Sequence, residues 1–147
     1  MKRINTDKIY RLWSLIIYTH GKSKYRKDLP FLRFRPGKDT DITYGEYYPQ
    51  TNTVEIKWKP HLDFKDLSST MLHEYAHYLQ FWPWSVRYRE MYKYDDNPYE
   101  VEARIMEKEA PDLIRMISPE EWSKAVKKKK KLLRIYRDIN KKIIIEL

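Results

Sequence analysis

Two histidines and a glutamate stand close together in the segment MLHEYAHYLQFWPW, which covers residues 71–84. If this segment is a helix, His73 and His77 project from the same face, one turn apart, and can bind a single metal ion. Zinc accepts imidazole nitrogens at about 2.0–2.1 Å. Glu74 would lie about 100° around the helix from His73, where it can take a proton from a water molecule that the metal has acidified. The spacing therefore predicts two zinc ligands and a general base on one helix.

A catalytic zinc ion needs a third protein ligand and an open position for water. No histidine follows His77 closely, because the other two histidines of the chain are His20 and His61. The segment NPYEVEARIMEKEA, on the next predicted helix, offers Glu100 and Glu102 instead. These two glutamates point to roughly opposite faces of their helix, so we expect one of them, and not both, to complete the site.

The segment HEYAHYLQ, followed by E-V-E-A at residues 100–103, resembles the Glu-zincin metallopeptidases. In those enzymes a second helix carries an E-x-x-A motif, and its first glutamate is the third zinc ligand. The resemblance implies that His73, His77 and Glu100 bind Zn²⁺, with Glu102 as the alternative third ligand.

The same resemblance implies an activity, the hydrolysis of peptide bonds in a peptide or protein substrate, with Glu74 as the general base. The order of strand, hairpin, HExxH helix and glutamate helix is also similar to the minimal zincin core of ImmA/IrrE-like peptidases. That similarity covers about residues 31–110. Zincins of this plan bind substrate as an added strand at the sheet edge beside the active helix, and residues 53–58 are the candidate edge.

One residue departs from the pattern of these peptidases. In many of them Asp or Asn follows the alanine of the motif, and an Asp there orients a ligand histidine, whereas this chain has Arg104. Either another residue supplies that contact, with Asp95 and Asp96 as the candidates, or metal affinity and activity are reduced. The alternative function is therefore a catalytically lapsed zincin-fold module that acts by binding a partner.

The transition state of peptide hydrolysis also needs a hydrogen-bond donor for its oxyanion. The sequence offers Tyr44, Tyr47, Tyr99 and His61 for this role, and it does not choose among them.

Hydrophobic periodicity and capping residues indicate the elements that carry these side chains. The expected elements before the histidines are a helix over residues 5–18 capped by Thr6 or Asp7, a strand over 31–35, and a hairpin with arms at 42–48 and 53–58. The histidine helix should begin near Asp63, with Asp66 in a capping-box position, and run to about Phe81. The expected elements after it are a loop or broken helix over residues 82–98, a helix over 99–109, a helical turn over 112–117, and a helix from residue 119 past 135 that Ser118 caps.

This order predicts an α+β fold similar to a minimal zincin. A small antiparallel or mixed sheet of about three strands would pack on the N-terminal helix and the HExxH helix, with further helices at the C-terminus. The chain of 147 residues fits one domain, residues 1–147, with its core at about 31–110 and a basic helix at about 119–140. The chain contains no cysteine, which excludes thiolate-bound zinc, thiol catalysis and disulfides.

The net charge of +9 is concentrated near the C-terminus, where residues 124–142 carry ten Lys and Arg against one Asp. Such a segment is either a solvated helix face or a nucleic-acid contact, so a nucleic-acid-associated protein is a further hypothesis. We do not favour it, because aromatic residues that stack on bases are not interleaved with the lysines. No stretch approaches the roughly 20 apolar residues of a membrane span, and no cleavage site follows LWSLIIY. We therefore expect no membrane association and a cytoplasmic protein of bacterial or viral origin.

Overall fold

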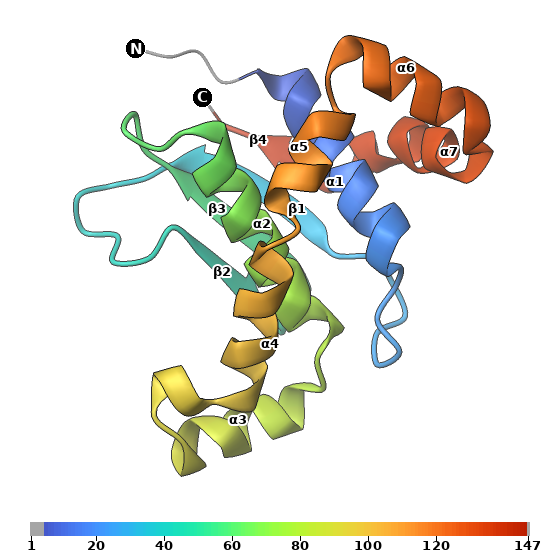
Figure 1. The fold of residues 1–147 in the computed structure, drawn as a ribbon. Helices are drawn as coiled ribbons and strands as arrows, with labels where there is room; N and C mark the ends of the chain where they lie inside the picture. Colours follow the sequence, from blue (N-terminus) through green and yellow to red (C-terminus); the bar gives the residue numbers. More distant parts are fainter. Residues whose placement is uncertain (1–4, 147) are drawn as a thin grey trace.

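A four-stranded sheet lies at the centre of the fold, with its strands in the order β2–β3–β1–β4 (Figure 1). The computed structural model describes residues 5–146, so residues 1–4 and 147 of the expected domain lie outside the described residues. β1 (Phe31–Pro36) is parallel to β3 (Thr53–Trp58) and to β4 (Ile143–Ile145), and β2 (Gly45–Tyr48) is antiparallel to β3. The mixed sheet and its helices form an α+β fold, which confirms the predicted class.

The strand order corrects two predictions. The isoleucine strand β4, which the sequence analysis does not expect, makes the sheet one strand larger. The prediction that residues 53–58 form the free edge is wrong, because β3 lies between β2 and β1. The edge strand on this side of the sheet is β2. It pairs with β3 in the predicted hairpin, but it starts at Gly45 rather than at residue 42.

The polar face of β3 is covered rather than exposed to solvent. Glu55 and Lys57 are buried although their neighbours Val54 and Ile56 face the core. The Glu55 carboxylate lies 3.4 Å from Arg35 Nε, and Lys57 Nζ lies 3.9 Å from Asp41 in the loop between β1 and β2. Asp41 in turn binds the Arg35 guanidinium through two hydrogen bonds of 3.1 and 3.2 Å. The strand alternation is therefore as predicted, but both faces of β3 are inside the protein.

The two helices that contact the core of the sheet begin at side-chain caps. α1 (Thr6–His20) is capped by Asn5, whose Oδ1 accepts from the Lys8 N–H, so the predicted caps Thr6 and Asp7 are wrong by one or two residues. α2 (Phe64–Leu79) begins in the predicted capping box, in which Asp63 and Asp66 each accept from the backbone N–H of the other. α2 ends at Leu79 because Gln80 has an extended backbone.

The connection after α2 is a broken helix, which is one of the two predicted alternatives. It forms α3 (Trp82–Met91) and the short 3₁₀ helix η1 (Tyr94–Asp96), which lead into α4 (Pro98–Glu107) and α5 (Ala110–Met116). α4 runs along α2, whereas α3 has no buried residue and extends away from the sheet (Figure 1).

The predicted single C-terminal helix is broken at Lys129. α6 (Pro119–Lys128), which Ser118 caps as predicted, and α7 (Lys130–Asp138) form a hairpin against α1, and η2 (Ile139–Lys142) connects α7 to β4 (Figure 1). The break lets the Trp122 ring of α6 meet the Tyr136 ring of α7 with centroids 5.2 Å apart, a contact that residues 14 positions apart on one straight helix could not make.

The core is continuous from α1 through the sheet side of α2. Trp13 and Tyr75 are fully buried, and their rings meet edge to face with centroids 5.3 Å apart. Within residues 5–146, no helix has the length and apolar character needed to cross a membrane.

Candidate metal centre

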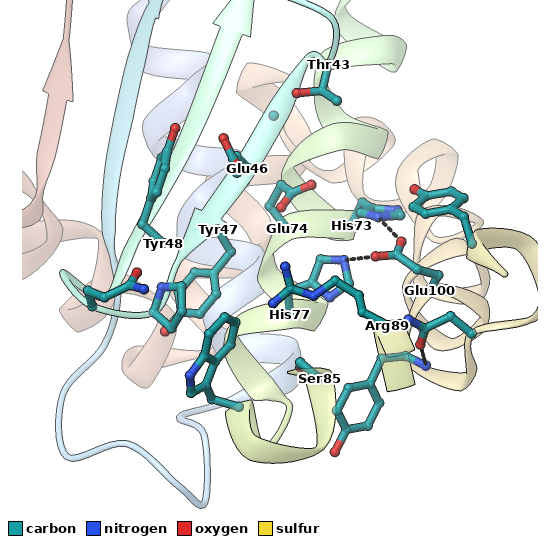
Figure 2. Close-up of a pocket in the computed structure, with 17 residues that line it drawn as sticks. Thr43, Glu46, Tyr47, Tyr48, His73, Glu74, His77, Ser85, Arg89 and Glu100 are labelled. Atoms are coloured by element: carbon teal, nitrogen blue, oxygen red, sulfur yellow. Dashed lines mark hydrogen bonds and ion pairs between the residues drawn. The ribbon is translucent and has the colours of Figure 1, made fainter. Parts of the chain in front are cut away.

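The side chains of His73, His77 and Glu100 converge in the space between α2 and α4 (Figure 2). His73 Nε2 lies 3.0 Å from Glu100 Oε2, and His77 Nε2 lies 3.1 Å from Glu100 Oε1. The rings share one face of α2, with centroids 5.0 Å apart. The structure thus brings together the three residues that the sequence analysis predicts as metal ligands.

This donor set fits a divalent transition metal. Donor atoms around a tetrahedral zinc at about 2.0–2.1 Å lie about 3.4 Å apart, so separations of 3.0 and 3.1 Å require only a small expansion. Burial opposes ionisation of Glu100, but hydrogen bonds from His73 and His77 outweigh it and hold the pKa of this carboxyl below its usual range. Two imidazoles and an ionised carboxylate are ligands that Zn²⁺ prefers, and the chain offers no thiolate to compete.

The outer nitrogen of His77 is held by a residue that the sequence analysis does not include. Gln80 Oε1 lies 2.7 Å from His77 Nδ1, and Gln80 Nε2 donates to the Tyr99 carbonyl and to Glu102 Oε2. Glu102, the alternative third ligand, therefore lies on the far side of His77 from Glu100. It acts on the histidine only through Gln80.

The outer nitrogen of His73 faces a second carboxylate of α4. Glu107 Oε1 lies 3.6 Å from His73 Nδ1. In the described part of the chain, Gln80 and Glu107 meet the two histidines, so the prediction that Asp95 or Asp96 does so is wrong. Arg104 points elsewhere and donates to the Asp95 carbonyl over 2.6 Å.

Glu74 lies beside this group and faces the sheet edge (Figure 2). Its carboxylate and the His73 and His77 nitrogens lie within 4.8 Å of one another, although Glu100 makes the closer contact to both rings. His73, Glu74 and His77 are thus close enough to hold a metal ion together, and we assign the ligand role to Glu100 because its two oxygens lie 3.0 and 3.1 Å from the histidine nitrogens. Burial raises the pKa of Glu74, although the nearby His77 and His73 oppose the shift.

Gly45 allows the β2 backbone to approach α2 closely at this point. A Cβ atom at Gly45 would lie 2.5 Å from Thr70 Cγ2 and 3.1 Å from Glu74 Cγ. Only glycine fits between these side chains, so the close approach places Glu74 directly beside the edge strand.

A cleft of about 430 Å³ opens between β2 and α3, with the histidines and both glutamates in its wall. Its lining comes from three sides: the β2 edge and its flanking residues (Thr43, Gly45, Glu46, Tyr47, Tyr48, Pro49, Gln50), the helices α2 and α4 (His73, Glu74, His77, Asn97, Tyr99, Glu100), and the α3–η1 connection (Trp82, Ser85, Arg89, Tyr94).

The candidate oxyanion donors are distributed unequally. Tyr47 and Tyr99 line the cleft, but the Tyr47 hydroxyl already donates to Asn52 Oδ1 over 2.8 Å. Tyr44 and His61 are not in the lining and contact each other instead, with the Tyr44 hydroxyl 3.4 Å from His61 Nε2. Tyr94, which the sequence analysis does not consider, lines the cleft, where burial and the Glu100 carboxylate raise its pKa to about 12.

His20 and the lysine-rich C-terminal segment lie outside the site. His20 binds Glu109 Oε1 over 2.8 Å at the end of α1. The lysine-rich hairpin of α6 and α7 contributes no residue to the cleft. Comparisons with models of protein families, with characterised proteins and with solved structures gave no match to this chain.

Proposed function

We propose that this protein is a zinc-dependent metallopeptidase of the Glu-zincin type. The observation that carries the proposal is the convergence of His73 Nε2, His77 Nε2 and the Glu100 carboxylate within 3.0–3.1 Å, in the wall of an open cleft with Glu74 beside them. The contacts of Gln80 and Glu107 to the outer nitrogens support it further, because ligand histidines in metal sites are usually oriented in this way.

His73, His77 and Glu100 would hold the metal, and Glu74 would act as the base. A bound Zn²⁺ supplies a Lewis acid that polarises a peptide carbonyl and lowers the pKa of a water molecule. Glu74 accepts a proton from the attacking water while the water oxygen bonds to the carbonyl carbon. It then donates that proton to the amide nitrogen as the carbon–nitrogen bond breaks, which leaves a carboxylic acid and an amine. Its raised pKa suits a group that must both accept and donate a proton.

The β2 strand would align the substrate. The Lys57 N–H donates to the Tyr44 carbonyl, so residue 44 directs its backbone groups toward β3. Along an antiparallel pair every second residue does so, and the residues between them direct their N–H and C=O groups to the other side. Gly45 and Tyr47 therefore direct these groups away from β3. An extended peptide can pair with these groups as an added strand and pass Glu74. Tyr94 would donate a hydrogen bond to the developing oxyanion, because it lines the same cleft and a phenol is protonated at neutral pH.

Metal analysis combined with a cleavage assay tests the proposal. The wild-type protein should contain about one zinc per chain and cleave members of a quenched-fluorescence peptide library, and a chelator should abolish the cleavage. Glu74→Gln should keep the zinc and lose at least about 100-fold in rate, because the proton acceptor is gone. Zinc binding without cleavage by the wild type would refute the peptidase and identify a binding module.

A further inference from the structure

The cleft contains one strong cation, Arg89 on α3, which has no acidic partner. Within residues 5–146, Arg89 forms no hydrogen bond and no ion pair, and its guanidinium lies over the Trp82 ring at 5.3 Å. Figure 2 shows the side chain extending from α3 into the space in front of His77. A guanidinium at this position lies within the same cleft as the metal-binding candidates.

The three carboxylates in the cleft wall are each engaged by other groups. Glu100 binds both histidines, Glu74 is buried against β2, and Glu46 lies 3.8 Å from Lys57 Nζ. Among the described residues that line the cleft, Arg89 is therefore the charged side chain that remains available to bind a ligand. A guanidinium binds a carboxylate through two parallel hydrogen bonds, which gives both charge and geometric selectivity.

We propose that Arg89 is a carboxylate-binding subsite that selects substrates with a negative charge close to the scissile bond. The carboxylate is either an Asp or Glu side chain or the C-terminal carboxylate of a short peptide. This inference rests on the proposed function, because it assumes that a peptide occupies the cleft. It adds to that function a preference for acidic substrates, for which the metal ligands and Glu74 do not account.

Arg87 provides a matched control on the same helix. Its guanidinium lies over the Trp84 ring at 5.0 Å, as Arg89 lies over Trp82, but Arg87 does not line the cleft. Replacing either arginine with glutamine lowers the net charge by one, so both variants change the general attraction of a +9 protein for anions equally.

Binding should be measured in the zinc-loaded Glu74→Gln protein, which leaves peptides intact. The probes are dye-labelled Ala/Thr decapeptides followed by fluorescence anisotropy: one with a central Glu and an amidated end, one with Gln in its place, and the Gln peptide with a free C-terminal carboxylate. Because the rest of each peptide is a uniform Ala/Thr sequence, the peptide can bind in the register that places its carboxylate against Arg89. We expect at least one carboxylate peptide to bind about five- to tenfold more tightly than the neutral one.

Arg89→Gln should abolish this preference, and Arg87→Gln should retain it. The peptide that loses affinity identifies the source of the carboxylate. Equal binding of all three peptides, or the same loss in both arginine variants, would overturn the inference. Cleavage of these peptides by the wild-type protein separates the two proposals: Arg89-dependent binding without cleavage refutes only the peptidase, and cleavage without a carboxylate preference refutes only the subsite.

Discussion

Gln80, the residue that caps the C-terminus of α2, places its Oε1 atom 2.7 Å from Nδ1 of His77. The orientation of the amide is fixed, because its Nε2 group faces two acceptors, the Tyr99 carbonyl and the Glu102 carboxylate. Gln80 Oε1 therefore accepts a hydrogen bond from the Nδ1–H group of His77, which leaves Nε2 as the ring nitrogen that can bind a metal once it carries no proton.

Gln80→Leu should weaken zinc binding by about 10- to 100-fold, because His77 loses the contact that fixes its ring and its tautomer. Competition against a chromophoric chelator measures the affinity. Gln50→Leu is the matched control, since Gln50 is an exposed glutamine at the rim of the same cleft. Unchanged affinity in Gln80→Leu would show that His77 does not need this orientation.

The two glutamates of the E-V-E-A segment should have unequal effects on metal content. Glu100→Ala should lose more than about 100-fold in zinc affinity, because removing a ligand costs more than removing an outer contact. Glu102→Ala should lose no more than about tenfold, because Glu102 acts only through Gln80. Zinc analysis of the two purified variants beside the wild type checks the order. The reverse order would assign the third ligand to Glu102.

The two histidine ligands could be predicted from the sequence because they are close together in the chain. His73 and His77 are one helical turn apart, and α2 begins at the predicted capping box, so the helix and its exposed face follow from short-range rules. Glu100 could be chosen over Glu102 only by resemblance, since which face of α4 meets α2 depends on packing. Glu107, seven residues after Glu100, lies on that same face and could have been found by helical spacing.

Other parts of the site depend on long-range contacts that leave no local pattern. The edge strand was assigned wrongly because β3 pairs with β1 as well as with β2, and the alternation of residues 53–58 does not reveal a second partner strand. The strand β4 was missed because it pairs with β1 across more than a hundred positions of the chain. Arg89 and Tyr94 enter the cleft because the α3–η1 connection folds back beside α4, and this connection has no hydrophobic periodicity that would predict its path.

Tyr94→Phe should lower the rate of peptide cleavage by about tenfold to 100-fold and leave the zinc content unchanged. Tyr94 is 63% exposed, so the loss of its hydroxyl should cost less than the loss of a fully buried oxyanion donor. Steady-state kinetics should place the effect in kcat rather than in KM. Tyr44→Phe, which removes a hydroxyl outside the cleft, should be without effect on either constant.

Gly45→Ala should destabilise the protein by about 1–3 kcal/mol, because the added Cβ overlaps Thr70 Cγ2 and crowds Glu74 Cγ. Urea unfolding with an unchanged m-value would report this loss. Thr70→Ser removes the nearest atom and keeps the hydroxyl, which donates to the Asp66 carbonyl. The double variant should therefore recover at least half of the lost stability. A purely additive double variant would mean that the strain lies in the β2 backbone instead.

Asp41→Asn should make the stability of the protein less sensitive to acid. Hydrogen bonds from Arg35 and from the Lys38 N–H hold the pKa of Asp41 below its usual range, although partial burial opposes them. A carboxyl whose pKa is lowered on folding stabilises the protein above its unfolded pKa of about 3.9, and that stabilisation is lost as the pH falls through the folded value. The variant should thus be less stable than the wild type at pH 7, with a difference that shrinks below about pH 4.

Urea midpoints at pH 7 and pH 3 for the wild type, Asp41→Asn and Asp39→Asn separate this effect from general acid unfolding. Asp39 is an exposed aspartate of the same loop, and within residues 5–146 it forms no ion pair, so its substitution should leave both midpoints unchanged. Because Asp41 anchors the loop that leads into β2 and covers Lys57, the loss at pH 7 should also appear as faster hydrogen exchange at the Lys57 amide, which bonds the Tyr44 carbonyl. A constant difference between wild type and Asp41→Asn at both pH values would show that Asp41 does not titrate with a lowered pKa.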